Sequence, residues 1–147
     1  MKTLHFAATI NAPRKQVWDV MLGAETFKAW TSAFAEGSYF EGTWDEGQKI
    51  RFLIPDASGM VSMITRNRPY EFISIQHLGV IKDGIEDTES EAARNWAPAY
   101  ENYTFSDAGT ATGLKIDVDT PPDFEAFMED AWPKDLAKLK ALCEEGT

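Results

Sequence analysis

The sequence predicts an α+β fold in which a curved antiparallel sheet of about seven strands wraps around one long C-terminal helix. Residues 38–119 alternate aromatic and β-branched runs with turn-forming residues, a pattern typical of an antiparallel meander. Residues 123–145 place apolar side chains at helical spacing, which indicates an amphipathic helix. Because a sheet with one apolar face must bury that face, we expect this helix to cover it.

The first part of the chain is predicted to form one strand and two short helices. Residues 3–10 alternate apolar and polar side chains, which is the period of a half-buried strand. Pro13 favours the start of a helix that Gly23 should end, and a second short helix is predicted over residues 25–34.

Six further strands are predicted, because short apolar runs are separated by segments rich in turn-forming residues. We expect them at residues 38–44, 48–54, 60–67, 71–80, 100–106 and 112–119. The long connection at residues 82–95 is acidic, which predicts a solvated loop that can include a helical turn, with a lid as the alternative. In the final helix Pro133 should introduce a kink, since its ring clashes with the carbonyl of Glu129.

Composition narrows the classes of function. The length of 147 residues predicts a single domain over residues 1–147. The formal net charge of −10 argues against binding to nucleic acid or to anionic lipid surfaces. Cys143 is the only cysteine, which excludes an internal disulfide and favours a reducing, cytoplasmic location. No apolar run approaches the roughly 18 residues of a membrane-spanning helix, so no membrane insertion is expected.

No catalytic residue, metal site or cofactor is predicted. His5 and His77 are the only histidines, and neither has a partner at metal-ligand spacing. The sequence also lacks a Gly-x-Ser-x-Gly motif, a phosphate-binding glycine loop and a dinucleotide fingerprint.

Aromatic content is high, at 12% of residues, and has two interpretations. The large apolar side chains between helix and sheet could fill a core, or they could line a ligand pocket whose wall offers extensive contact area. The candidate wall consists of Trp30, Phe34, Trp44, Phe52, Ile54, Ile75, Tyr103, Ile116, Phe127, Met128 and Trp132.

Two polar residues interrupt the apolar faces of predicted strands. His77 follows Ile75 by alternation, and Glu101 precedes Tyr103 in the same way, so both are expected to point inward from neighbouring strands. The pair is a candidate for the main polar feature of the pocket, able to orient a ligand or to move a proton. The alternative is that the two residues meet water at strand ends or form a purely structural contact.

Several framework motifs occur in a recognisable order. They are Ile10-Asn11-Ala12-Pro13, Val17-Trp18, Trp30, Gly42-Thr43-Trp44, Tyr100-Glu101-Asn102-Tyr103 and Trp132-Pro133. This order resembles the START-like (SRPBCC) superfamily, which includes polyketide cyclases and birch-pollen-allergen-like proteins. Within it the chain resembles the branch named after the activator of the Hsp ATPase. The resemblance implies a helix-grip fold, in which a curved sheet grips the long helix around a cavity.

Three functions are consistent with these sequence features. The first is a carrier or sensor that binds a small hydrophobic molecule, such as a lipid, polyketide or aromatic metabolite, as a monomer or dimer. The second is an enzyme of the polyketide-cyclase or lyase kind that uses His77 and Glu101. The third is a co-chaperone-like domain that binds a chaperone or other protein through its acidic surface.

Overall fold

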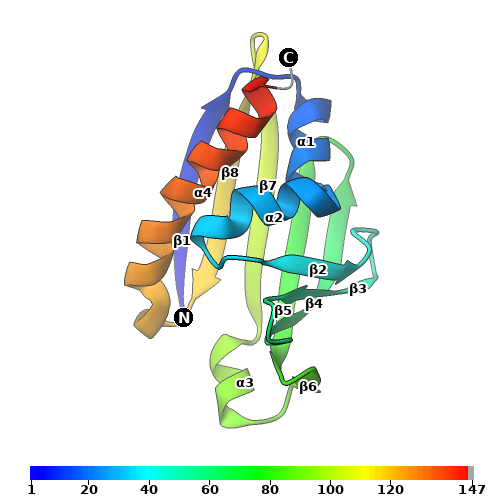
Figure 1. Cartoon of the computed structure of the whole chain (residues 1–147), viewed down its shortest axis with the longest axis vertical. Coiled ribbons are helices and arrows are strands. Elements are labelled where there is room, and N and C mark those ends of the chain that lie inside the picture. The colour runs from blue at the N-terminus through cyan, green and yellow to red at the C-terminus, as the bar shows by residue number, and fades with distance from the viewer. Residues whose placement is uncertain (146–147) are drawn as a thin grey trace.

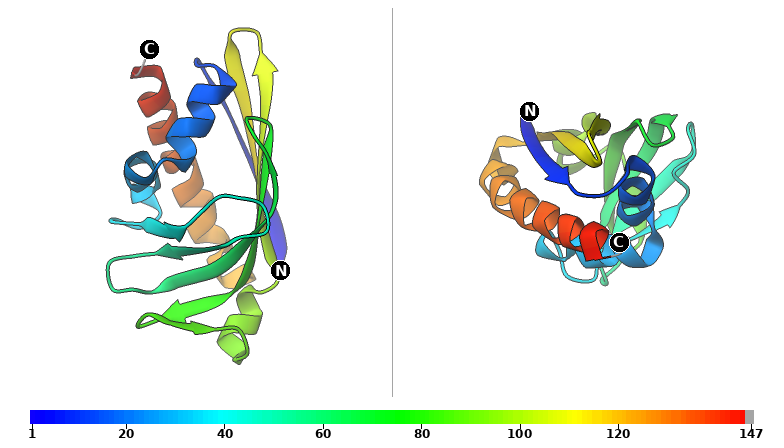
Figure 2. Two further views of the ribbon diagram at one scale, coloured as in Figure 1. Left: turned by 90° about the vertical axis from the view of Figure 1, so that its right-hand side faces the viewer. Right: turned by 90° about the horizontal axis from the view of Figure 1, so that it is seen from above.

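The computed structural model describes residues 1–145 and shows one sheet with helices on one of its faces (Figures 1 and 2). The strands are β1 (Lys2–Ile10), β2 (Tyr39–Gly42), β3 (Lys49–Leu53), β4 (Gly59–Arg68), β5 (Phe72–Lys82), β6 (Ile85–Asp87), β7 (Ala99–Ala108) and β8 (Ala111–Thr120). The α-helices are α1 (Arg14–Leu22), α2 (Ala24–Trp30), α3 (Glu91–Trp96) and α4 (Glu125–Glu145). Two short 3-10 helices, η1 (Thr31–Ala33) and η2 (Pro122–Phe124), precede Phe34 and α4.

The strands are ordered β1-β8-β7-β5-β4-β3-β2, with β6 paired to β5, and every pairing is antiparallel. The sheet curves around α4, and α1 and α2 lie beside α4 on the same side (Figure 2). We call this the inner face of the sheet and the opposite one the outer face. The predicted α+β fold, with its curved antiparallel sheet and long C-terminal helix, is therefore confirmed.

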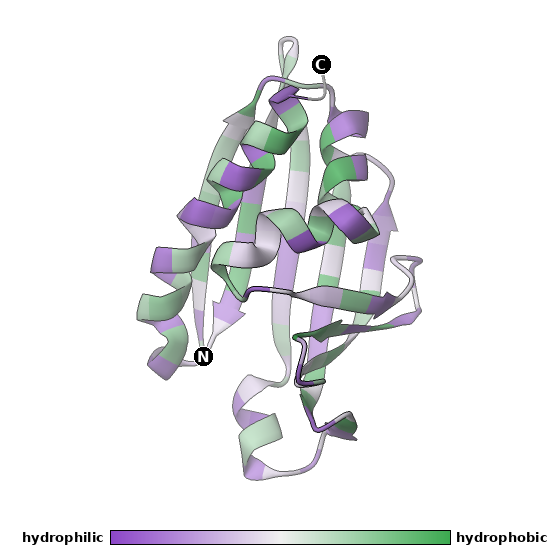
Figure 3. Cartoon of the chain, in the orientation of Figure 1, coloured by the Kyte–Doolittle hydropathy of each residue, from purple (hydrophilic) through white to green (hydrophobic). Residues whose placement is uncertain are grey.

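The core lies between α4 and the inner face because both surfaces are apolar there. One row of paired residues crosses four strands and consists of Phe6, Ile116, Tyr103 and Ile73. The helix contributes side chains spaced three or four residues apart, which are Met128, Trp132, Leu136, Leu139 and Cys143. Figure 3 shows hydrophobic and hydrophilic residues alternating along α4.

Two segments differ from the sequence-based expectation. The strand expected at residues 38–44 ends at Gly42, whose φ of 115° lies in a region that favours glycine. Trp44 therefore lies beyond the strand and is half-buried instead of buried. The acidic segment expected as a loop contains β6 and α3, which gives the sheet its eighth strand.

No helix within residues 1–145 combines the length and the apolar character that crossing a membrane requires.

Pro133 lies inside α4, which continues from Glu125 to Glu145, and its side chain is exposed. Replacing Pro133 with Ala should stabilise the protein by about 1–3 kcal/mol, because alanine restores a backbone donor and opens no cavity at an exposed site. Urea unfolding of the variant, with Lys134→Ala as a neighbouring surface control, measures this difference. A large loss of stability in Pro133→Ala alone would show that α4 depends on the proline at this position.

Candidate functional site

The candidate wall residues divide into a buried group and a more exposed group. The buried group packs in the main core and comprises Trp30, Ile75, Tyr103, Ile116, Met128 and Trp132. Trp44 and Phe52 are half-buried and pack against that core, whereas Ile54 follows β3 and is half-buried outside it. Phe34 and Phe127 are 38% and 42% exposed, so they lie at the surface of the protein.

His77 and Glu101 are brought together, as expected from their strands. His77 Nε2 lies 3.3 Å from Glu101 Oε1, and the side chains are 10% and 18% exposed. The two residues are diagonal neighbours, because Glu101 pairs with Ile75 and His77 pairs with Ala99. The predicted contact between the two side chains is thus present on the inner face.

Two further residues extend this contact into a hydrogen-bonded chain. Ser62, on β4, pairs with His77 and places its Oγ 2.7 Å from His77 Nδ1. The hydroxyl of Tyr103 donates to Glu101 Oε2. We call Ser62, His77, Glu101 and Tyr103 the polar cluster.

The direction of the hydrogen bonds follows from the chemistry of a carboxylate. An ionised Glu101 can only accept, so His77 donates from Nε2 and Tyr103 donates from its hydroxyl. Nδ1 of a neutral His77 then accepts from the hydroxyl of Ser62. Burial, together with the nearby Glu101 and Asp135, raises the pKa of Tyr103 well above its usual value, so the phenol stays a donor. The donors of His77 and Tyr103 therefore point toward Glu101, and the hydroxyl of Ser62 points toward His77.

Asp135 is a buried carboxyl that the sequence analysis did not single out. It is 2% exposed, and its Oδ1 accepts from the backbone N–H of Ala33 at 3.1 Å. Burial raises the pKa of Asp135 to about 7, opposed by the N–H groups of Ala33 and Phe34 and by Lys138 and reinforced by Glu101. Helical spacing could have indicated this residue. Asp135 follows Trp132 by three positions and therefore lies within the apolar stripe of α4.

Two buried donors have no hydrogen-bond partner among the described residues, namely Nε1 of Trp44 and Nε1 of Trp132. Trp132 is 4% exposed, and its ring lies 6.2 Å from that of Tyr103. A buried N–H without a partner is unfavourable by about 1–3 kcal/mol, so this indole has an unused donor next to the polar cluster.

Four aromatic side chains form a continuous strip at the surface of the protein. Ring centroids are separated by 4.7 Å between Trp96 and Phe124, 6.3 Å between Phe124 and Phe127, and 5.2 Å between Phe127 and Phe34. This aromatic strip joins α3, η2, α4 and the residue that follows η1.

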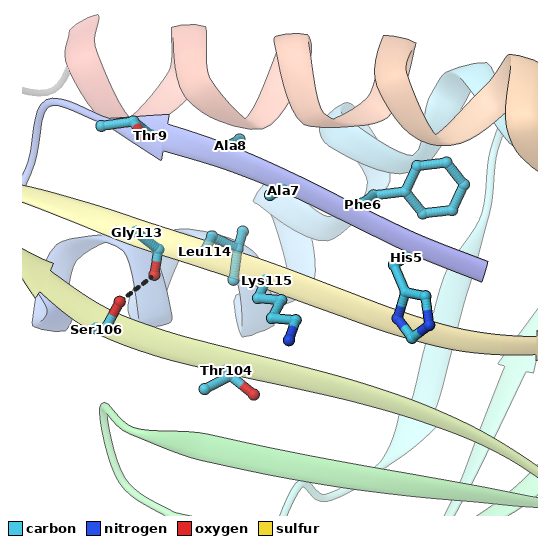
Figure 4. A pocket seen from close by; sticks show the side chains of 10 residues that line it. All are labelled: His5, Phe6, Ala7, Ala8, Thr9, Thr104, Ser106, Gly113, Leu114 and Lys115. Carbon is cyan, nitrogen blue, oxygen red and sulfur yellow. Dashed lines mark hydrogen bonds between the residues drawn. The ribbon is translucent and has the colours of Figure 1, made fainter. Parts of the chain in front are cut away.

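Two hollows lie elsewhere on the surface. One, of about 530 Å³, is on the outer face and is lined by residues such as His5, Ala7, Thr104 and Lys115 (Figure 4). The other, of about 490 Å³, lies beside Arg14 and Tyr70. None of the candidate wall residues lines either hollow, and the space between α4 and the sheet is occupied by the side chains described above.

Comparison with solved structures identifies the fold. The Aha1 dimer from Colwellia psychrerythraea is 16% identical over 100% of this chain and 99% of its own, with a TM-score of 0.75. CalU16 from Micromonospora echinospora is 15% identical over 96% of this chain and 75% of its own, with a TM-score of 0.67. DynU16, from the dynemicin biosynthetic locus, is 15% identical over 100% of this chain and 49% of its own, with a TM-score of 0.73.

These likenesses show the fold alone, because the identities are low. They confirm the helix-grip architecture that the sequence motifs implied. No protein-family model matches the sequence, and no curated protein matches it.

Proposed function

We propose that this protein is a carrier or sensor for a small apolar molecule bearing a hydroxyl group. The molecule would bind between α4 and the inner face of the sheet by displacing core side chains that fill this space in the structure. The observation that carries the proposal is the polar cluster, which gathers four hydrogen-bonding side chains on an otherwise apolar face. Hydrogen-bonded polar groups are no better than apolar packing for stability alone, so their presence inside the fold favours a role in recognition.

The charge and geometry of the cluster define the group that it would bind. Glu101 accepts from both His77 and Tyr103, and its 18% exposed side chain retains lone pairs for a further donor. The unpartnered N–H of Trp132 lies beside Tyr103 and offers a donor of its own. A hydroxyl group can donate to Glu101 and accept from Trp132, which satisfies both side chains with one functional group.

The surroundings favour an apolar body for the rest of the ligand. The ring of Phe52 lies 6.1 Å from that of His77, and Trp132 lies between Phe6 and Tyr103. Aromatic rings provide large contact areas for flat apolar molecules, and a small number of polar groups then fixes their orientation.

Native mass spectrometry of the protein purified without denaturation tests the proposal. We expect a bound small molecule, or a rise in melting temperature on addition of 2-naphthylmethanol, which has an aromatic body and one hydroxyl. If no ligand co-purifies and a panel of aromatic and aliphatic alcohols leaves the melting temperature unchanged, the proposed function is wrong.

The hydrogen-bonded chain also favours a second function, that of a proton-transfer enzyme. A carboxylate held by His77 and Tyr103 can act as a general base toward a carbon acid such as an aryl ketone. Glu101 would remove a proton from the methyl carbon of 2-acetylnaphthalene, and in D₂O a deuteron would return to that carbon. Loss of the methyl ¹H NMR signal should then be faster with wild type than with Glu101→Gln, and equal rates would leave binding as the function.

A further inference from the structure

The end of α2 is fastened to α4 by polar contacts through η1. Lys138 donates to the hydroxyl of Ser32, and the N–H of Ala33 donates to Asp135. Both contacts join a residue of the short η1 segment to α4, so they hold η1 against that helix.

Phe34, the next residue of the chain, adds an apolar contact with α4. We call these contacts of Ser32, Ala33 and Phe34 with α4 the seam. Phe34 lies edge-on against Phe127, with the ring centroids 5.2 Å apart. These two side chains are the most exposed of the candidate wall residues, at 38% and 42%. By contrast, Tyr103 on β7 and Trp132 on α4 are 2% and 4% exposed.

A ligand can reach such a buried site only if part of its cover moves. The sheet side is closed by paired strands, whose hydrogen bonds would have to break for an opening there. The Phe34–Phe127 contact requires no broken strand pairing, because it joins a 3-10 helix end to one side chain of α4.

We propose that the ligand enters and leaves between Phe34 and Phe127, and that the contact of Asp135 with η1 controls how often this seam opens. The inference rests on the proposed function and identifies the route to the same site. Asp135 does not touch the ligand. It is a positioning residue that holds η1, and with it Phe34, against α4.

The charges around Asp135 predict how pH acts on the seam. Glu101 and Tyr103 face it from β7, Lys138 faces it from α4, and η1 presents only backbone N–H groups. In the closed seam, burial raises the pKa of Asp135 to about 7. An opened seam exposes the carboxyl to water, where its pKa returns toward 3.8. Opening is therefore linked to loss of a proton, and ligand access should be faster at higher pH.

Stopped-flow fluorescence with N-phenyl-1-naphthylamine, a neutral probe, tests this linkage. For wild type, the association rate should rise about tenfold between roughly pH 5.5 and 8.5, given the direction and size of the linkage. Asp135→Asn should give the low rate at every pH, because the amide resembles the protonated acid. The control Asp130→Asn removes an exposed charge from the same helix and should keep the wild-type rise. A tenfold rise that survives in Asp135→Asn would overturn the proposal.

Two variants locate the route. Phe34→Ala removes one side of the seam, and Trp96→Ala removes the far end of the aromatic strip. Phe34→Ala should raise the association and dissociation rates about tenfold while changing the Kd less than threefold. Acceleration by Trp96→Ala and not by Phe34→Ala would place the route at α3 and contradict the proposal.

A measurement without ligand separates the seam from the proposed function. Exchange of the Ala33 amide hydrogen, corrected for its intrinsic pH dependence, should be faster at pH 8 than at pH 6 in wild type and should not differ in Asp135→Asn. If N-phenyl-1-naphthylamine does not bind but Ala33 exchange depends on pH and on Asp135 as expected, the proposed function is wrong and only the pH-dependent opening of the seam is supported. If the probe binds and Ala33 exchange is independent of Asp135, the seam fails alone.

Discussion

Replacing Glu101 with Gln is expected to abolish the preference of this protein for an alcohol over its methyl ether. In wild type, 2-naphthylmethanol should bind about 10–100-fold more tightly than the ether, because a hydrogen bond to a charged group contributes about 1.5–3 kcal/mol. The ether has the same aromatic body and an oxygen acceptor for Trp132, but it has no proton to donate to Glu101. Isothermal titration calorimetry of the two ligands measures the preference directly.

The glutamine variant keeps an oxygen that can accept from Tyr103, so the fold should be retained. In this variant the two ligands should differ less than about threefold, because the charged acceptor is gone. Glu129→Gln, an exposed change on α4, is the matched control and should behave as wild type. An undiminished preference in Glu101→Gln would show that another group receives the hydroxyl.

Replacing Asp135 with Asn should make the protein more stable at pH 8 and equally stable near pH 4. Folding raises the pKa of Asp135 from 3.8 to about 7, so the folded state holds this proton more tightly than the unfolded chain does. The associated stability is complete below about pH 4 and is lost as the pH rises toward 7. Three pKa units correspond to on the order of 4 kcal/mol, which is an upper limit for the gain at pH 8.

Urea unfolding of wild type and Asp135→Asn between pH 4 and 8 measures this effect. The difference between the two proteins is the informative quantity, because other carboxyls such as Asp56 and Glu86 have lowered pKa values and lose their stabilising contributions in acid. Asp130→Asn provides the matched surface control. A difference that does not vary with pH would show that Asp135 is ionised throughout this range.

The regular elements could be predicted from the sequence because their hydrophobic periods are long and uninterrupted. The stripe on α4 and the alternation in β1 both persist for several repeats, and burial in the structure follows them. The sequence does not predict β6 as a strand, and it predicts α3 only as a helical turn, since each is short and acidic residues surround them. In such segments, local packing against β5 decides the structure more than periodicity does.

The polar cluster was predictable only in part. Alternation indicated that His77 and Glu101 face inward, but the partner of His77 depends on strand register. Counting back from the hairpin, where Arg68 pairs with Phe72, would place Ser62 opposite Leu78. The register shift between Ile64 and Arg66 puts Ser62 opposite His77 instead. A β-bulge leaves little trace in one sequence, so Ser62 could not be assigned.

The contact between Phe34 and Phe127 could also be predicted only in part from the sequence. Helical spacing identified Phe127 as part of an apolar stripe, yet it does not report what lies opposite each residue of that stripe. In the structure, Phe127 meets Phe34 at the surface, whereas the adjacent Met128 is buried. The position of η1 makes this difference, and it depends on contacts with Asp135 and Lys138 that are distant in sequence.

NMR mapping of the binding site for 2-naphthylmethanol tests whether the ligand binds inside the fold. Methyl and imidazole signals should be followed for Ile75, His77 and Met128 inside the fold, and for Ala7 and Thr104 in the outer hollow of Figure 4. We predict saturable shifts at the three inner residues and unchanged signals at the two outer ones. Shifts confined to Ala7 and Thr104 would contradict an internal site and place binding on the outer face of the sheet.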